Sequence, residues 1–196
     1  MALTPANIRV AAGRIYTGVT NPASGSVLAL VAGVPATGSE IGFTQGEAVF
    51  TYEVTYDEEM SDQVLGPVAV FATQESMQLE FTMLEYAASQ LNLFFQKAAL
   101  TVDNVSTPKT DLFTMGNLGT TGNTVTRTSV YLVSPIPSTS PQRYTIVGLY
   151  SAYQSQAAAA RYTREGSTVM KTTFKAIADV TRNAGDFMGQ VVIERN

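Results

Sequence analysis

The sequence predicts a mainly β fold of the α+β class, an antiparallel β-sandwich or barrel with one flanking α-helix. Short runs in which apolar and polar side chains alternate recur along the chain, and segments rich in Gly, Pro, Asn and Thr separate them. A single stretch, residues 84–98, changes to the spacing of a helix. No internal repeat divides the 196 residues, so we expect one domain that spans positions 1–196.

The first part of the chain predicts short strands joined by turns. Residues 8–16 form a β-like opening that Gly13 interrupts, and residues 20–26 combine Asn, Pro and Gly in a predicted turn. The apolar run 27–32 has the length of a strand. Residues 37–46 are polar and rich in Gly, which predicts a loop.

A β-hairpin with charge at its tip is predicted next. Residues 48–56 alternate, and their aromatic and apolar members share one face: Phe50, Tyr52, Val54 and Tyr56. Residues 64–71 resume a strand pattern, in which Pro67 indicates an edge or a bulge. An acidic turn is expected between the two strands: Asp57, Glu58, Glu59 and Asp62.

An alternating strand leads into the predicted helix. Residues 76–83 place their apolar side chains on one face: Met77, Leu79, Phe81 and Met83. The helix is expected over residues 84–98, where Glu85 and Lys97 suit the two ends of its dipole. Its apolar face, which we expect to pack on the sheet, carries Ala87, Leu91, Phe94 and Phe95.

The second half of the chain begins with a long irregular region near residues 103–142. Within it, residues 103–126 predict a loop or a set of ragged hairpins. Strands are expected at residues 128–133, 143–152, 168–178 and 190–194. The Ala-rich residues 154–160 are too few to predict a helix.

The composition argues against catalysis. The chain has no Cys and no His, which excludes a thiol nucleophile, a zinc ribbon, an imidazole ligand and a Ser-His-Asp triad. Chemistry that uses two carboxylates stays open, but we predict a protein that is not an enzyme and uses no cofactor and no metal. Charged residues make up 14% of the chain, against about a quarter in typical globular proteins. A surface this neutral suits a protein that partners cover, and a neutral but soluble monomer is the alternative that the composition leaves open.

Charge and hydropathy also limit the partners. The net charge of −4 and the lack of a dense Lys/Arg cluster argue against tight binding to nucleic acid. No apolar run reaches the length that crosses a membrane, and residues 1–9 lack the basic and apolar segments of a secretory signal. We therefore expect no membrane association and no secretory signal.

Acidic and basic residues separate along the chain. The acidic group of the hairpin lacks the alternate ligand spacing and the Gly of a calcium loop, so a solvated turn is favoured over a metal site. A third interpretation is an acidic surface that faces DNA without binding it. Basic residues concentrate in the C-terminal quarter: Arg161, Arg164, Lys171, Lys175 and Arg182. They are either scattered solubilising charges or a surface that pairs with the acidic region of a neighbouring copy.

Two stretches carry a family resemblance. Residues 47–96 read EAVFTYEVTYDEEMSDQVLGPVAVFATQESMQLEFTMLEYAASQLNLFFQ, a Glu-rich strand and turn followed by an alternating strand that runs into a helix. The closing stretch reads STVMKTTFKAIADVTRNAGDFMGQVVIE, two strands around an Ala-x-x-Asp segment. This order of elements resembles the tail tube proteins of bacteriophages with long, non-contractile tails. Residues 103–142 do not match the pattern.

The resemblance implies an assembly and a location. In that family six copies close into a ring, strands of each copy join one β-barrel around a channel, and rings stack into a conduit for the genome. The implied partners are further copies of the chain, the tape measure protein, tail-end proteins and, in transient passage, double-stranded DNA. The implied location is the virion, after synthesis in the bacterial cytoplasm. By position the hairpin 47–71 would line the channel, with its lumen or rim charges at Glu53, Asp57, Glu58, Glu59 and Asp62.

Other classes stay open at this point. A tail terminator or the inner tube of a contractile injection system would share the fold. A carbohydrate-binding β-sandwich would need an exposed aromatic platform, for which the candidates are Tyr131, Tyr144, Tyr150, Tyr153 and Tyr162. An enzyme would rest on carboxylates such as Glu80 and Glu85, which we expect to be surface charges.

Overall fold

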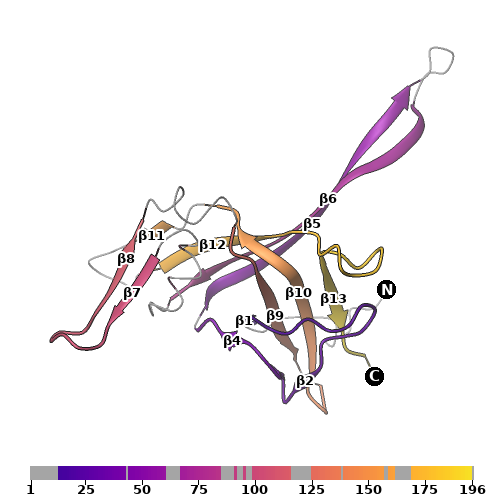
Figure 1. The fold of residues 1–196 in the computed structure, drawn as a ribbon. Helices are drawn as coiled ribbons and strands as arrows, with labels where there is room; N and C mark the ends of the chain where they lie inside the picture. The colour runs from indigo at the N-terminus through magenta and orange to yellow at the C-terminus, as the bar shows by residue number, and fades with distance from the viewer. Residues whose placement is uncertain are drawn as a thin grey trace.

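The computed structural model shows a protein built from β-strands (Figure 1). It describes residues 13–42, 44–60, 67–84, 91, 95, 99–115, 125–137, 139–156, 159–161 and 169–195. In these residues the strands are β1 (Arg14–Thr17), β2 (Leu30–Val31), β3 (Val34–Pro35), β4 (Ser39–Glu40), β5 (Thr44–Met60), β6 (Pro67–Met83), β7 (Ala99–Asp103), β8 (Thr110–Thr114), β9 (Thr128–Ile136), β10 (Arg143–Gln154), β11 (Ala159–Arg161), β12 (Val169–Ala176) and β13 (Gly189–Ile193). The prediction of a mainly β fold is confirmed.

One large antiparallel sheet organises the molecule. Its strands follow the order β4-β1-β9-β10-β12-β6-β5, with β13 paired to β10 and β11 paired to β12. The hairpins β2–β3 and β7–β8 form two separate two-stranded sheets. Because β4 and β5 are the two ends of the order, the sheet does not close into a barrel within the described residues.

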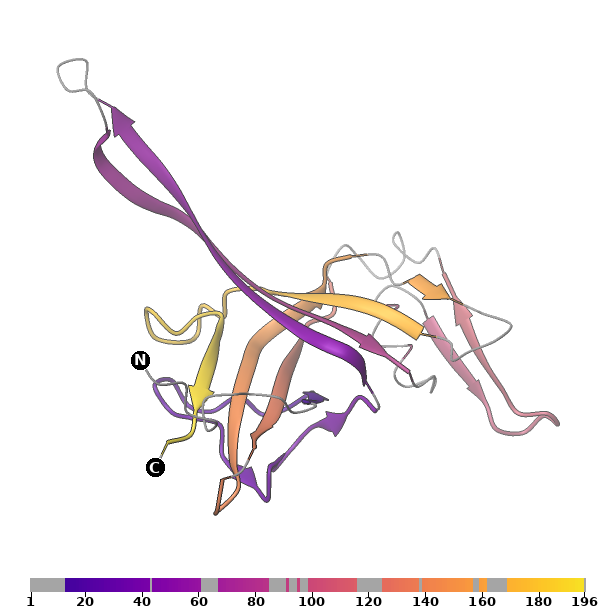
Figure 2. The same ribbon diagram turned by 180° about the vertical axis from the view of Figure 1, so that it is seen from behind.

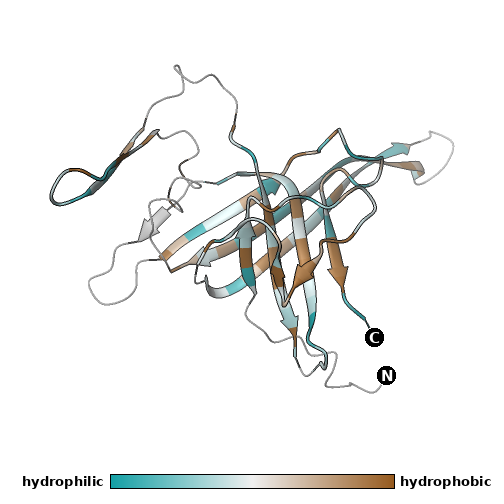
Figure 3. Ribbon diagram, turned by 60° about the horizontal axis from the view of Figure 1, so that its bottom comes forward, coloured by the Kyte–Doolittle hydropathy of each residue, from teal (hydrophilic) through white to brown (hydrophobic). Residues whose placement is uncertain are grey.

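The core lies on both faces of β9 and β10, where apolar residues follow one another without alternation (Figure 3). On one face, Leu149 of β10 packs with Phe81 and Phe174, whose rings stack with centroids 5.9 Å apart. On the other face, Ile146 packs with Tyr131 and other buried side chains. The strand predicted at 143–152 therefore lies in β10, which is buried on both faces in its central part.

The alternation predicted for residues 76–83 is confirmed. Met77, Leu79, Phe81 and Met83 are buried, while the residues between them are half-buried. This half of β6 lies between β12 and β5, and its apolar row points into the core cluster. Successive side chains of a strand point to opposite faces, so this pattern arises when a packed layer covers one of the two faces.

The predicted acidic turn is wrong in its position. Asp57, Glu58 and Glu59 lie inside β5, opposite Phe71, Val70 and Ala69 of β6; Asp62 lies outside the described residues. The predicted strands at 64–71 and 76–83 are parts of one 17-residue strand. Consecutive acids are compatible with a strand here because both faces of this part of the hairpin are open to water. Pro67 is the first residue of β6 and lies beside a register shift, which agrees with the edge or bulge predicted at this residue.

Two N-terminal expectations also change. The apolar run 27–32 forms only the two-residue strand β2, because Ala32 and Gly33 both have positive φ (49° and 81°) and turn the chain back into β3. A side chain at Gly33 would in addition overlap the Tyr144 ring. The predicted loop 37–46 contains β4 and the start of β5.

The second half follows its predictions with two refinements. Residues 103–126 open with the turn of the β7–β8 hairpin, which is one of the two forms expected for this region. The Ala-rich stretch 154–160 ends in the short strand β11, which pairs with β12. The strands predicted at 128–133, 143–152, 168–178 and 190–194 correspond to β9, β10, β12 and β13.

The predicted helix at 84–98 falls mostly outside the described residues, including Ala87 and Phe94. Of its apolar face, Leu91 packs against the core cluster, and the Phe95 N–H donates to the Leu91 carbonyl at 2.8 Å, the spacing of one α-helical turn. The element order of the described part contains no helix. The described residues also contain no helix that is long and apolar enough to cross a membrane.

Candidate functional site

The β5–β6 hairpin extends far beyond the rest of the molecule (Figures 1 and 2). β12 accompanies β6 only from Gln78 to Met83. Beyond that point the ribbon consists of residues 52–60 of β5 and 67–77 of β6, which we call the arm. No third strand of the described residues pairs with it. Among the residues that the structure describes, no strand therefore pairs with the main-chain groups along the two edges of the arm.

One face of the arm is apolar. In the register of the arm, Tyr52 lies opposite Met77 and Tyr56 lies opposite Ala72. On β5, Tyr52, Val54 and Tyr56 continue the row of side chains that begins in the core at Phe50. Four large side chains of this face are between 53% and 63% exposed: Tyr52, Tyr56, Met60 and Val70. An apolar surface of this kind on a protruding ribbon marks an interaction site.

The opposite face carries three acidic side chains beside one exposed apolar side chain, Phe71, which lies opposite Asp57. Glu53, Asp57 and Glu59 alternate with the apolar row and point the other way, and all three are exposed. The chain has no Lys and no Arg between residues 15 and 96, so the strands of the arm hold no cation. In the described part of the chain no group of three or more carboxylates could hold a metal ion. The three carboxylates therefore make this face of the arm negative.

Two carboxylates interrupt the apolar face. Glu75 pairs with Val54, and Glu58 pairs with Val70, so both share the side of Tyr52 and Tyr56. Local desolvation, and after it the negative charge of Glu75, raise the pKa of the Tyr52 phenol. A partner that covers the apolar face would therefore have to provide groups that pair with these two carboxylates.

The arm also carries a built-in bend. The pairing shifts by one residue between Thr55 and Tyr56, which leaves Thr73 as the extra residue of β6. The Thr73 hydroxyl donates to the Thr55 carbonyl at 3.2 Å across this bulge. A β-bulge increases the local twist of a ribbon and changes the direction of its faces.

The predicted basic residues divide into different environments. Lys171 bonds Glu80 at 2.7 Å within the chain, across β12 and β6. Glu80, one of the two carboxylates considered for an enzyme, is therefore part of an ion pair. Its carboxylate also lies near the Thr173 hydroxyl. Lys175 is half-buried in β12. Arg164 and the side chain of Arg161 lie outside the described residues.

Arg182 belongs to a buried network. Its side chain is 8% exposed, bonds the Asp186 carboxylate at 2.8 Å and lies 3.7 Å from the centre of the Tyr150 ring. The Tyr150 hydroxyl donates to the same carboxylate at 2.8 Å, as does the Ser24 hydroxyl at 2.9 Å. Burial opposes the charge of Asp186, but these donors hold its pKa well below the ordinary value. The network joins the N-terminal loop, β10 and the loop before β13.

The tyrosines proposed as a carbohydrate platform do not form one. Tyr131 and Tyr150 are buried, and burial raises the pKa of Tyr150 to about 12. Tyr144 and Tyr153 are half-buried, and Tyr162 lies outside the described residues. The exposed tyrosines of the arm, Tyr52 and Tyr56, were assigned to a strand face by the sequence but not to an interaction site. Their exposure could not be predicted from the sequence, because alternation shows which side chains share a face but not what covers that face.

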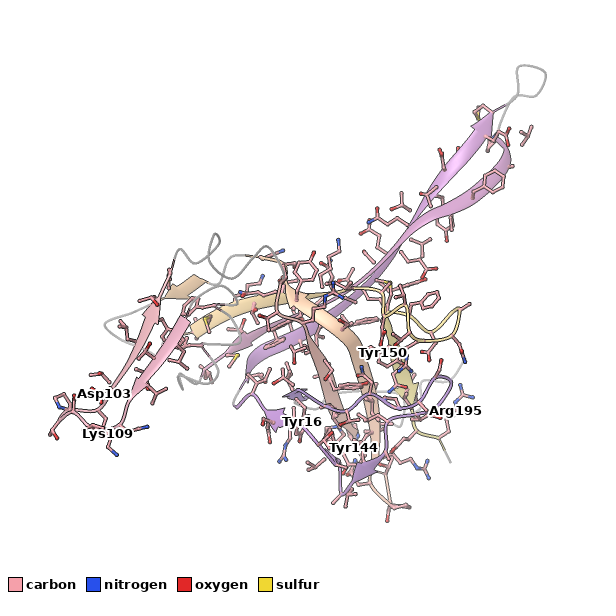
Figure 4. The ribbon with its side chains drawn as sticks, viewed as in Figure 1. Tyr16, Asp103, Lys109, Tyr144, Tyr150 and Arg195 are labelled. Atoms are coloured by element: carbon pink, nitrogen blue, oxygen red, sulfur yellow. The ribbon has the colours of Figure 1, made fainter. Side chains whose placement is uncertain are left out.

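A cavity lies near the start of β1 and is lined in part by Tyr144, which is labelled in the lower part of Figure 4. Its volume is about 690 Å³, and its two charged side chains, Arg14 and Glu40, face each other at 3.8 Å. Arg14 and Glu40 already pair with each other, and both side chains remain partly exposed. The cavity therefore holds no charged side chain that is directed at a ligand. The arm is therefore the best candidate for the functional site.

No protein-family model matches the chain, and no curated protein matches its sequence at a significant level.

Proposed function

We propose that the chain is a structural subunit that assembles with copies of itself into the tail tube of a bacteriophage with a long, non-contractile tail. The single observation that carries the proposal is the arm, a long β-ribbon with two free edges, an apolar face and an acidic face. A two-stranded ribbon is marginally stable in water by itself. Its free edges and exposed aromatic side chains therefore favour a partner that supplies both main-chain hydrogen bonds and apolar cover.

Neighbouring copies can supply both. If β5 of one arm pairs with β6 of the next, the ribbon becomes part of a continuous antiparallel sheet, and closure into a ring removes every edge. The apolar faces then turn toward the bodies of the subunits, and the acidic faces with Glu53, Asp57 and Glu59 toward the bore. The family resemblance supplies the expectation of six copies in a ring.

The proposed function requires no chemistry from the chain. An acidic bore repels the phosphate backbone, so double-stranded DNA would pass without binding. The other proposed partners are the tape measure protein inside the tube and the proteins at its two ends. The proposed location is the virion, and the low charge content of the chain fits a surface that neighbours largely cover.

Electron microscopy of the purified full chain tests the proposal, with negative staining over a range of protein concentrations. We expect hollow tubes from the wild-type protein. The variant Tyr56→Asp places a charge on the apolar face of the arm, and we expect a folded protein that forms no tubes. Val31→Asp is the matched control, because Val31 is 71% exposed on β2, far from the arm, and we expect it to assemble normally.

Three other outcomes would change the conclusion. Particles that stop at a single ring would indicate a tail terminator instead of a tube subunit. Tubes formed by Tyr56→Asp as readily as by wild type would remove the arm from the assembly. A wild-type protein that stays monomeric at every concentration, as measured by light scattering, would overturn the proposal.

A further inference from the structure

The last strand, β13, lies at the side of the body from which the arm leaves (Figures 1 and 2). It pairs with β10, and no second strand of the described residues pairs with its other edge. The start of β13 touches the base of the arm, because a Cβ atom at Gly189 would lie 3.1 Å from the terminal methyl group of Met77. From this contact the arm projects away from the body, while β13 stays beside β10.

The two faces of β13 have different environments. Val192 packs against a buried core cluster on one face. Val191 and Ile193 point to the other face, and they are 50% and 43% exposed. The register places Val191 beside the buried Val147 of β10, so the exposed pair continues an apolar surface of the body. Apolar side chains that gather on an exposed sheet face indicate a docking surface.

Two cations lie at the end of the same face. The ladder of β13 with β10 continues past the strand, because the Glu194 N–H donates to the Tyr144 carbonyl at 3.1 Å. One residue further, the same register sets Arg195 opposite Arg143, on the side of Ile193. The Glu194 side chain belongs to the other side, and its carboxylate accepts from the Tyr144 N–H at 2.7 Å. We call the surface of Val191, Ile193, Arg195 and Arg143 the β13 face.

The β13 face lacks an anion of its own. Arg195 is exposed and Arg143 is half-buried (Figure 4). The ion pairs of the described residues involve neither of them. Like charges directly opposite each other across two strands are destabilising, so a carboxylate from a partner would relieve their repulsion. The β13 face therefore fits a partner that is apolar and carries an anion.

The apolar face of the arm has this chemistry. Glu75 lies opposite Val54, between Tyr52 and Tyr56, so a partner that covers the two tyrosines also takes Glu75 out of water. A buried carboxylate is stable only beside a cation or other donors. Because residues 15–96 contain no Lys and no Arg, a cation from this chain has to come from another region. The β13 face supplies two cations at the end of an apolar row.

One copy of the chain does not bring these surfaces together. The base of the arm touches β13 at Met77. Beyond that contact Tyr52 and Tyr56 of the arm are exposed, and so are Val191 and Ile193 of the β13 face. A single chain therefore leaves both apolar surfaces in water, and mutual burial requires a second copy.

We propose that the apolar face of the arm of one copy packs on the β13 face of the next copy, with Tyr56 against Ile193 and Glu75 beside Arg195. The inference rests on the proposed function, because it names the part of the neighbouring body that covers the arm. The two surfaces differ, so the contact is heterologous and leaves one free surface at each end of every row of copies. Such a contact repeats from copy to copy.

Chemical cross-linking tests this contact, and the chain suits it because it contains no native Cys. The double variant Tyr56→Cys/Ile193→Cys carries one thiol on each surface. A short bismaleimide should convert the assembled variant into a ladder of covalent multimers on a denaturing gel, whereas a bridge within one chain leaves a monomer. The matched control is Tyr56→Cys/Val105→Cys, because Val105 is even more exposed but lies in the turn between β7 and β8, at the end of the molecule opposite the arm (Figure 1).

The outcomes separate the two proposals. Tubes in the microscope together with a ladder from the Ile193 pair alone support the docking. Tubes without a ladder, or with equal ladders from both pairs, overturn the docking and leave the tube intact. A cross-linked monomer from the Ile193 pair would show that the arm covers its own body, which also overturns the docking. No assembly of the wild-type chain overturns both proposals.

A charge exchange provides a second test. Arg195→Glu and Glu75→Arg each bring like charges together at the proposed contact, and each should raise the protein concentration needed for assembly by about tenfold. The double variant reverses the pair and should assemble as wild type does. Lys109→Glu makes the same charge change as Arg195→Glu at an exposed residue before β8 and should have no effect. Equal effects of Arg195→Glu and Lys109→Glu, or no restoration in the double variant, would contradict the pairing.

Discussion

The two halves of the β5–β6 hairpin belong to the same pair of strands and have opposite environments. Near the body, the apolar row of β6 ends in the core, where Leu79 is 0% exposed. In the arm, the same strand continues with Val70, which is 54% exposed. The register continues one face of the hairpin from the body into the arm, but what covers that face differs. The chain covers the first half itself, and the second half is left for a partner.

The largest effect should come from breaking the covered half. Leu79→Asp buries an unpaired charge among apolar side chains, which costs several kcal/mol and should prevent folding. Val70→Asp makes the same change on the same strand in the arm, where water reaches the side chain. We expect it to shift the free energy of unfolding by no more than about 0.5 kcal/mol. Urea titrations followed by circular dichroism measure both, and equal losses would show that the arm packs on its own body.

A second strong effect is expected at the buried network around Asp186. Arg182→Met removes the cation and leaves the carboxylate with its Tyr150 and Ser24 donors but without its counter-charge. Because the Asp186 side chain is 21% exposed, the pair is only partly buried, and we expect its loss to cost about 1.5–3 kcal/mol, less than for a fully buried pair. Lys171→Met breaks the exposed pair with Glu80 and should cost less than about 1 kcal/mol. A comparable loss in both variants would show that Arg182 contributes only as a surface charge.

The same network predicts how stability changes with pH. The pKa of Asp186 is lower in the folded protein than in the unfolded chain, so its contribution is present above the unfolded pKa of about 4. That contribution is lost as the pH falls below about 4 and Asp186 takes up a proton on unfolding. Asp186→Asn should be less stable than wild type at pH 7 and should lose less stability between pH 5 and pH 3. Thermal melts across this range test it, and parallel curves would contradict the role of Asp186.

The sequence predicted much of the fold because alternation is a local property. The faces of residues 48–56 and 76–83 followed from their spacing alone, and so did the strand at 143–152. The sequence predicted a turn at Asp57 to Glu59, because consecutive acids are typical of turns. These residues instead continue the ladder with Val70 and Phe71, and such a ladder depends on pairing between strands, which a local pattern does not show. The bend at Ala32 was missed since Ala rarely adopts a positive φ.

The candidate site was predicted only in part. The acidic residues of the hairpin were predicted as lumen or rim charges, which stays a prediction; the structure places three of them on one face of the arm and Glu58 on the other. Its apolar face could not be recognised, because Tyr52 and Tyr56 have the same pattern as a core strand. The network of Arg182 joins Ser24, Tyr150 and Asp186, which are far apart in the chain and meet only through the topology of the sheet.

The smallest expected effect concerns the acidic face of the arm, whose three carboxylates are exposed in a single chain. If arms meet around a bore, Glu53, Asp57 and Glu59 of each copy approach those of the next, and like charges oppose assembly. The variant Glu53→Gln/Asp57→Asn/Glu59→Gln should therefore assemble at a severalfold lower concentration in dilute salt. The difference should fade at about 1 M salt, where the screening length falls to about 3 Å. Light scattering at several salt concentrations measures this. A variant that assembles no more readily than wild type in dilute salt would place the acidic face away from its neighbours, on the outside of the assembly.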